Sequence, residues 1–314
     1  MLLDELIEDV LIIIFGYLNE QDIKNVELSS DRFSVIIEKN FYERKCINLL
    51  MTSHVKNFEF FRRTHGVLKY SDRLEVNKNW TYGTFSSTTF FQHRESYVPL
   101  MALDSSYFYT TQLGELKVFQ RDAKNGLKDK PYFFSGSKND SVITDLVKKD
   151  ETLAGCRENG SVFLYTEDDG YSEEFVFANK DKINSLDFYG NNFFVTTKNK
   201  SKLLNLSSEL GILTFDASTD FDDGYENIRY DLTGTKILAT RADNFYLIDS
   251  NTCQRTLLNF GKFQIFNTMW IDESCFLYTS YCNALTLIDC RMNFNKQEFS
   301  SGNFTATSID FDGR

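Results

Sequence analysis

The 314-residue chain has only two prolines, three histidines and no apolar run longer than six residues. That run, Val10 to Phe15, is far shorter than the ~20 residues that a membrane-spanning helix needs. Carboxylates precede it and no small-residue cleavage pattern follows it, so it does not resemble a secretory signal. We therefore expect no membrane association and a cytoplasmic or nuclear location, or both.

The six cysteines are dispersed along the chain, and no two of them lie within six residues of each other. This spacing argues against a zinc knuckle or a compact disulfide framework. The histidines lie apart from the cysteines, and neither a GxxxxGK nor a GxSxG motif occurs. Carboxylates are numerous, but we place them in turns, as solvated surface. The sequence thus predicts no metal site, no cofactor and no catalytic residue.

The formal net charge is −11, and Lys and Arg are scattered along the chain. Nucleic-acid binding and attraction to an anionic membrane both need a basic stripe or patch. We therefore expect neither nucleic acid nor a membrane surface as a partner.

Residues 1–48 have a helical period. Val10, Ile13, Ile14, Tyr17 and Leu18 fall at i, i+3, i+4, i+7 and i+8, on one helical face. The opposite face is apolar as well, so this helix is either wholly buried or docked on a partner. Asn19 and Ser30 are suited to cap two further short helices. Residues 49–96 are predicted to form a helix, a linker that ends at Trp80, and a strand leading into the next domain.

From residue 97 the period changes to short strands separated by polar turns. Four successive units cover 141–180, 182–215, 226–260 and 266–299, each with four predicted strands. Their second strands begin near Leu153, Phe193, Ile237 and Phe276, at intervals of 40, 44 and 39 residues. "LID" ends a third strand at Asp249 and again at Asp289. This period is typical of a WD-type β-propeller, in which each blade buries its faces against its neighbours.

With a propeller behind it, residues 6–37, "LIEDVLIIIFGYLNEQDIKNVELSSDRFSVII", resemble an F-box. The matching positions are Leu6, Val10, Ile14, Phe15, Tyr17, Leu18, Asp22, Ile23, Ser30 and Phe33. The chain departs from the family at Ile7, where proline is usual, at Asp9, where glutamate is usual, and at Phe33, where tryptophan is usual. "LEVNKNW" at 74–80 is similar to the Asn-Trp segment before the propeller in F-box/WD-repeat proteins, most like the dactylin-like branch.

The resemblance implies an α+β multidomain protein: an all-α F-box at 1–48, the linker at 49–96 and an all-β propeller at 97–314. It also implies a non-catalytic substrate receptor of a Skp–cullin–F-box ubiquitin ligase, with a Skp-family adaptor and cullin as partners. The expected adaptor contacts are Leu6, Ile7, Val10, Leu11, Ile14, Tyr17, Leu18 and Ile23. The alternative is a propeller scaffold for protein–protein interaction outside ubiquitination, and an enzyme is the third possibility.

Basic residues occur in the loops that crowd one rim of a WD-type propeller. The candidate substrate contacts are Arg157, Lys182, Lys198, Arg241 and Lys262. Solubilising surface is the simpler interpretation of these side chains. The sharper one is a cationic site for an acidic or phosphorylated degron, because Arg suits bidentate contacts with phosphate.

The predicted blades do not complete a seven-bladed ring. About five blades are present, and "FTATSIDFDGR" at 304–314 has the pattern of one further strand. The segment 83–92 has the alternation of a strand that could close such a ring. We therefore expect a propeller that is C-terminally incomplete and that exposes blade faces built for burial.

Overall fold

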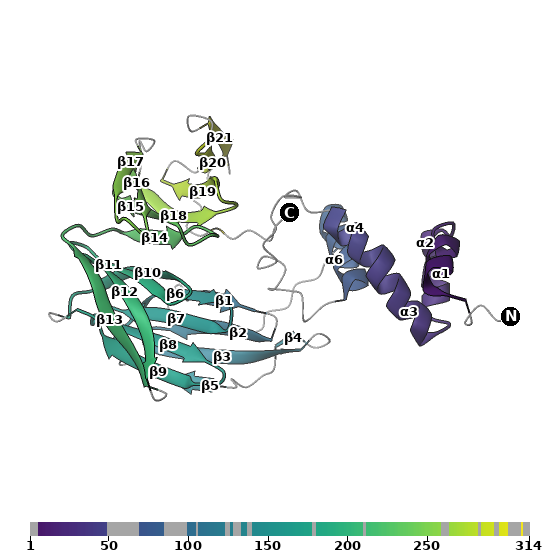
Figure 1. Cartoon of the computed structure of the whole chain (residues 1–314), viewed down its shortest axis with the longest axis horizontal. Helices are drawn as coiled ribbons and strands as arrows, with labels where there is room; N and C mark the ends of the chain where they lie inside the picture. Colours follow the sequence, from purple (N-terminus) through teal and green to yellow (C-terminus); the bar gives the residue numbers. More distant parts are fainter. Residues whose placement is uncertain are drawn as a thin grey trace. The chain divides into compact units, whose positions relative to one another are not determined.

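The computed structural model describes residues 6–48, 69–84, 99–104, 106–122, 126–127, 133–136, 140–177, 180–209, 212–258, 264–281, 284–291, 295–300 and 309. Backbone contacts divide the chain into a unit formed by residues 1–92 with 312–314, and a unit formed by residues 93–311. The first unit is helical and the second is built of β-sheets (Figure 1).

The helical unit begins with α1 (Glu8–Phe15), α2 (Glu20–Glu27) and α3 (Asp31–Ile37). Asn19 caps α2 as predicted, because its Oδ1 accepts a hydrogen bond from the Asp22 N–H at 2.9 Å. The helices enclose a small core of buried side chains: Leu11, Phe15, Ile23, Phe33, Ile36, Ile37 and Tyr42.

The chain then runs through a π-helical segment, η2 (Glu38–Tyr42), into α4 (Glu43–Asn48), and α6 (Tyr70–Tyr82) packs against both. The Glu38 carboxylate accepts hydrogen bonds from the backbone N–H groups of Tyr70 and, at 3.4 Å, of Ser71. The first N–H groups of a helix need such acceptors. Residues 70–80 of the predicted helical linker lie within α6, and the acceptor that starts this helix lies 32 residues earlier in the chain.

Removal of this acceptor is expected to loosen α6. Glu38→Ala leaves two N–H groups at the start of the helix without their partner, at a cost of about 1–2 kcal/mol. We expect faster amide hydrogen exchange over 70–82, with little change in α1. Glu75→Ala, an exposed position on the same helix, is the control. Equal exchange rates in the two variants would show that Glu38 does not anchor α6.

In the residues that the structure describes, the β unit forms five antiparallel sheets, each made of consecutive strands. Blade 1 comprises β1 (Met101–Leu103), β2 (Tyr107–Gln112), β3 (Glu115–Asp122), β4 (Gly126–Leu127) and β5 (Phe133–Ser135). Blade 2 comprises β6 (Ile143–Lys149), β7 (Thr152–Arg157), β8 (Ser161–Thr166) and β9 (Gly170–Phe175). Blade 3 comprises β10 (Ile183–Tyr189), β11 (Asn192–Thr197), β12 (Ser201–Glu209) and β13 (Ile212–Phe221).

Blade 4 comprises β14 (Asn227–Tyr230), β15 (Lys236–Arg241), β16 (Asn244–Asp249) and β17 (Arg255–Leu258). Blade 5 comprises β18 (Ile265–Trp270), β19 (Cys275–Ser280), β20 (Ala284–Asp289) and β21 (Asn295–Ser300). The second strands of blades 2 to 5 begin one residue before the predicted positions, and the third strands of blades 4 and 5 end at Asp249 and Asp289. The repeat period is thereby confirmed.

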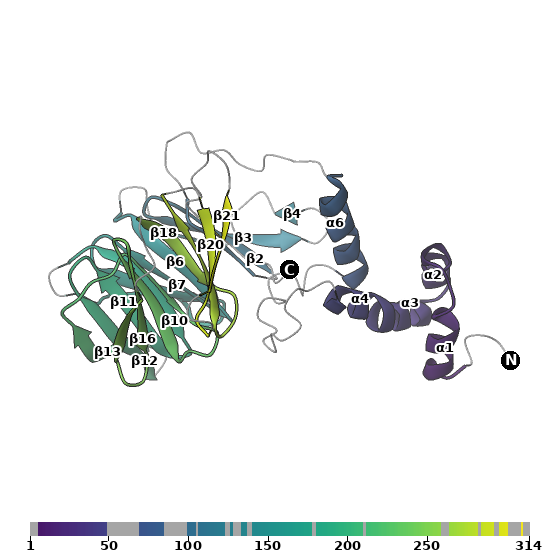
Figure 2. The same cartoon turned by 90° about the horizontal axis from the view of Figure 1, so that it is seen from above.

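Successive blades pack face to face, so the structure is a five-bladed β-propeller (Figures 1 and 2). One apolar cluster fills each of the junctions 1–2, 2–3, 3–4 and 4–5. At the junction of blades 4 and 5, for example, the rings of Phe245 and Phe276 are both fully buried, with centroids 5.5 Å apart. The first strands of neighbouring blades contact each other in chain order, which makes them the inner strands of the propeller.

The expectation of an incomplete propeller stays a prediction. Segment 304–314, apart from Ile309, and residues 85–92 lie outside the described residues. On the inner strand of blade 1, Met101 and Leu103 are 62% and 38% exposed.

Candidate functional site

Helix α1 has two apolar faces in different environments. Leu11 and Phe15 are buried, and the ring of Phe15 meets that of Phe33 edge-on with centroids 5.4 Å apart. On the other side, Ile13 of α1 and Tyr17, in the turn that follows α1, are 61% and 89% exposed. Large apolar side chains exposed along one helical face are typical of a docking surface. We call Val10 and Ile13 of α1, together with Tyr17 in the turn that follows it, the α1 stripe.

The residues predicted to contact an adaptor divide between these environments. Ile7 and Tyr17 are exposed, whereas Leu6, Val10, Ile14 and Leu18 are half-buried. Leu11 and Ile23 lie in the core of the unit, so their predicted direct contact with a partner does not fit the structure. Ile13 was part of the periodic face but not of the predicted contacts, and it is exposed.

The physical reason is the composition of α1. A helix that is apolar nearly all round carries no internal signal for which face packs inward. The choice is made by the tertiary contacts with α3, which cover Leu11 and Phe15 and leave Ile13 exposed.

Arg157, predicted to contact a substrate, is instead part of the propeller's interior. Its side chain is 3% exposed, and its Nη1 donates to the carbonyls of Gly114 and Ser141, both at 2.8 Å. Nη2 donates to the Tyr171 hydroxyl at 3.1 Å, and Nε pairs with the Glu173 carboxylate at 3.1 Å. The bond to Gly114, between β2 and β3, joins blade 2 to blade 1, and Tyr171 and Glu173 belong to β9 of blade 2 itself. The prediction that Arg157 contacts a substrate does not fit this burial, because the hydrogen bonds of its Nη1 and Nη2 go to groups of the protein itself.

The other predicted cations differ in their surroundings. Lys182 forms an ion pair of 2.5 Å with a glutamate of the β7–β8 turn, and Arg241 one of 3.2 Å with Asp223. Lys198 is exposed and forms no ion pair with any described residue. Lys262 lies outside the described residues. Of these four cations, Lys182 and Arg241 are thus paired with neighbouring carboxylates.

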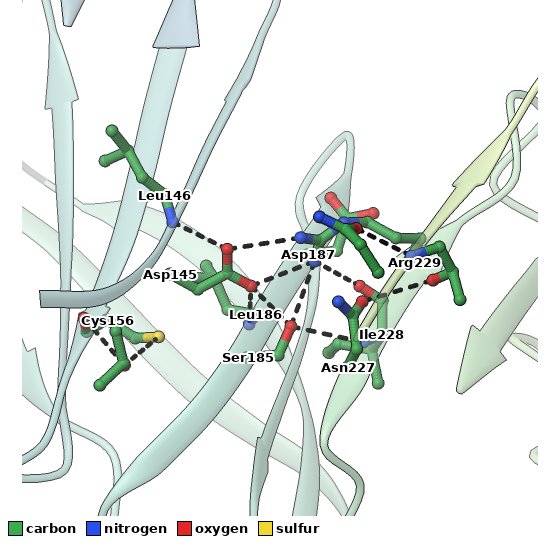
Figure 3. A network of polar contacts seen from close by, with 12 residues as sticks. Asp145, Leu146, Cys156, Ser185, Leu186, Asp187, Asn227, Ile228 and Arg229 are labelled. Atoms are coloured by element: carbon green, nitrogen blue, oxygen red, sulfur yellow. Dashed lines mark hydrogen bonds and ion pairs between the residues drawn. The ribbon is translucent and has the colours of Figure 1, made fainter. Parts of the chain in front are cut away.

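The inner strands carry a charged network that the sequence did not indicate (Figure 3). Asp145 on β6 accepts hydrogen bonds from the Ser185 hydroxyl at 2.6 Å and from the Leu186 N–H at 3.2 Å, both on β10. Arg229 on β14, 84 residues further along the chain, pairs with the same carboxylate at 3.1 Å. One carboxylate therefore connects the inner strands of three blades.

A second carboxylate extends this network. Asp187 on β10 accepts a hydrogen bond from the Tyr230 N–H on β14 at 2.7 Å and pairs with Lys149 on β6 at 2.6 Å. Asp145 and Asp187 are 8% and 1% exposed. Donors of the protein itself occupy both carboxylates, so the arrangement is suited to joining blades rather than to binding a ligand.

The electrostatics of the network keep its members in one state. Burial acts to lower the pKa of the Arg229 guanidinium, but Asp145 and Asp187 outweigh it and leave that pKa above its usual value. Burial, with Asp145 nearby, raises the pKa of the Cys156 thiol well above its usual value. Arg229 therefore stays charged and Cys156 stays a neutral thiol, which fits the expected role of the cysteine as a small core residue.

The placement of all carboxylates in turns was wrong for Asp145 and Asp187, which lie within inner strands. The signal that could have shown this is a carboxylate in the interior of an apolar strand, as in "ITDLV" and "INSLDF". A charge in such a place is rarely buried unless it is paired.

In the part of the chain that the structure describes, no group of three or more His, Cys, Asp or Glu side chains could hold a metal ion. No helix among the described residues is long and apolar enough to span a bilayer.

No protein-family model matches the sequence, and no curated protein matches it either. Among solved structures, one similar chain belongs to "Crystal Structure of Mitotic Checkpoint Complex", with a TM-score of 0.51 and 10% sequence identity. The match covers 67% of this chain and 66% of that chain. Such identity shows the fold alone. With 1277 matching chains, the fold is also too widely shared to indicate one function.

Proposed function

We propose that the protein is a substrate-recruiting subunit of a Skp–cullin–F-box ubiquitin ligase. The helical unit docks a Skp-family adaptor, the propeller holds a substrate protein, and a separate enzyme transfers ubiquitin. The observation that carries the proposal is the α1 stripe, whose Ile13 and Tyr17 are left exposed by the packing of the unit. The resemblance of residues 6–37 to an F-box supplies the identity of the partner.

The proposal is tested by replacing apolar side chains of the α1 stripe with charged ones. Ile13→Asp with Tyr17→Asp places charge on positions that are largely exposed in the free protein, so the fold should survive. Burying a large apolar side chain is worth roughly 1.5–3 kcal/mol, so the pair should weaken adaptor binding at least about 100-fold. Binding to purified Skp-family adaptor by calorimetry is the measurement. Ile14 and Leu18 are less suitable because they are half-buried against the core.

Tyr82→Asp is the matched control, since Tyr82 is also an exposed aromatic residue of the helical unit, at 72%. It should bind the adaptor like the unmodified chain. If the unmodified chain does not bind a Skp-family adaptor, the propeller scaffold outside ubiquitination becomes the better interpretation. If the stripe variant binds as tightly as the control, the docking surface has been misplaced.

A further inference from the structure

One position of the inner strands joins blades 2, 3, 4 and 5 in turn. Its side chain accepts a hydrogen bond from the following blade, from a donor that lies 41, 43 or 41 residues further along the chain. The three bonds run from the Leu186 N–H to Asp145 at 3.2 Å, from the Ile228 N–H to Ser185 at 3.3 Å, and from the Thr268 Oγ1 to Asn227 at 3.4 Å.

Asn267 is the fourth member of this series. It follows the bulge of β18 as Ser185 follows that of β10, and it pairs in register with Thr279 as Ser185 pairs with Thr196. The hydroxyl of Thr196 accepts the N–H of Tyr225, in the connection to blade 4, at 2.7 Å. The hydroxyl of Thr279 is buried and has no hydrogen-bond partner among the described residues. Buried polar groups are generally paired, so this hydroxyl is suited to accept an N–H from a segment that follows blade 5.

Blade 5 also carries an apolar face on the side of Asn267. Met269, Leu277 and Leu287 pair across β18, β19 and β20, and each is half-buried. Trp270, on the opposite face, belongs to the junction with blade 4. In the earlier junctions, the corresponding face is covered by two apolar residues of the next inner strand: Leu186 and Phe188 between blades 2 and 3, and Ile228 and Tyr230 between blades 3 and 4.

The end of the chain repeats the sequence of β10. "TSIDFDG" at 307–313 and "NSLDFYG" at 184–190 are identical at four of seven positions. The alignment places Ile309 and Phe311 where β10 has Leu186 and Phe188. Ile309 lies 42 residues after Asn267, within the range of the three observed bonds. Ile309 is also the one described residue of 304–314, and it is half-buried.

The same alignment supplies a donor for Thr279. Ala306 stands three residues before Ile309, as Tyr225 stands three residues before Ile228. The Ala306 N–H therefore corresponds to the N–H that the equivalent threonine of blade 3 accepts.

The length of the connection allows the chain's own segment to reach this face. Ile309 lies nine residues after Ser300, the end of β21. The corresponding residues of blades 3, 4 and 5 lie 11, 7 and 10 residues after the ends of the preceding outer strands, β9, β13 and β17. The interval of nine residues falls between these values.

We infer that residues 306–311 of this chain dock on the apolar face of blade 5 as one further inner strand. The Ile309 N–H donates to Asn267, the Ala306 N–H donates to the Thr279 hydroxyl, and the side chains of Ile309 and Phe311 cover the apolar face. The inference concerns the β unit alone and does not depend on the proposed function.

Hydrogen exchange of the full chain, followed by mass spectrometry, tests this docking. We expect the amides of 306–311 to exchange at least about 100-fold more slowly than in a free peptide of the same sequence, in a sample that light scattering shows to be monomeric. Asn267→Leu removes an acceptor and should speed this exchange about tenfold. Ile309→Asp with Phe311→Asp should abolish the protection, because it places unpaired charge against an apolar face. Asn267→Leu is the milder change and keeps the test valid if the double variant does not fold.

Two controls separate docking from a general effect. Asn192→Leu, at an exposed position of blade 3, matches Asn267→Leu. Phe175→Asp with Leu257→Asp, at positions 56% and 50% exposed on outer strands, matches the double variant. Both controls should leave the exchange of 306–311 unchanged. Unprotected amides in the unmodified chain would overturn the inference, as would equal protection in the Asn267 and Asn192 variants. Protection confined to a dimeric fraction would also overturn it, because the segment would then dock on a second copy of the chain.

Discussion

Arg157→Glu is expected to destabilise the propeller by about 3–5 kcal/mol, because it breaks a buried ion pair and leaves uncompensated charge inside the protein. The new carboxylate would stand beside Glu173, whose partner it replaces. It would also leave the carbonyls of Gly114 and Ser141 without their donor and could not supply one. Thermal unfolding followed by circular dichroism measures the loss, and for a domain of this size it corresponds to a fall in Tm of roughly 6–20 °C.

The matched control is Arg241→Glu, a residue with the same charge at the corresponding end of the second strand, in blade 4. Its side chain is 51% exposed and its ion pair with Asp223 faces solvent. We expect a change within about 0.5 kcal/mol, as for most surface substitutions. Similar melting temperatures for the two variants would show that Arg157 is not structural, and would restore it as a candidate for substrate contact.

The contrast between Arg157 and Arg241 shows which features could be predicted from the sequence and which could not. The propeller could be predicted because its evidence is repeated: strands recur with a period that places "LID" at the ends of two third strands, Asp249 and Asp289. Each blade repeats the same strand pattern, so an error in the predicted position of one strand does not change the predicted fold. The role of Arg157 is not repeated. Thr197 and Ser280 occupy the corresponding position in blades 3 and 5, so the loop type alone could not show that the arginine points inward.

The helical unit had the same limit. The short helices could be predicted from periodicity and from Asn19 as a cap, whose bond to Asp22 is local. The start of α6 at Tyr70 could not, because its acceptor is Glu38, 32 residues away. Nor could the sequence choose between Ile13 and Leu11 as the exposed residue, since both faces of α1 are apolar. Interactions within one helical turn can be predicted from a sequence, whereas features that depend on contacts between distant residues cannot.

The charged network of the inner strands was the least predictable feature, because Asp145 and Arg229 are separated by 84 residues in the chain. In space, β10 lies between their strands, β6 and β14. Arg229 donates to Asp145 and to Ser185, and it also bonds the carbonyl of Ile228 at 2.6 Å. Since the Asp145 carboxylate also accepts the N–H groups of Leu146 and Leu186, its loss of a cationic partner would leave a buried, hydrogen-bonded anion.

Arg229→Met is therefore expected to cost about 3–5 kcal/mol, since it removes one partner of a largely buried pair. Asp145→Asn added to Arg229→Met removes the stranded charge and keeps one oxygen acceptor, for either the Leu146 or the Leu186 N–H, so the double variant should be more stable than Arg229→Met alone. The coupling energy from this double-mutant cycle, measured by chemical denaturation, isolates the pair. Arg291→Met, which breaks an exposed pair with Asp289 of 2.8 Å, should not change stability measurably. Simple additivity of the two inner-strand substitutions would mean that Arg229 and Asp145 stabilise the propeller independently, and that the ion pair does not join the blades.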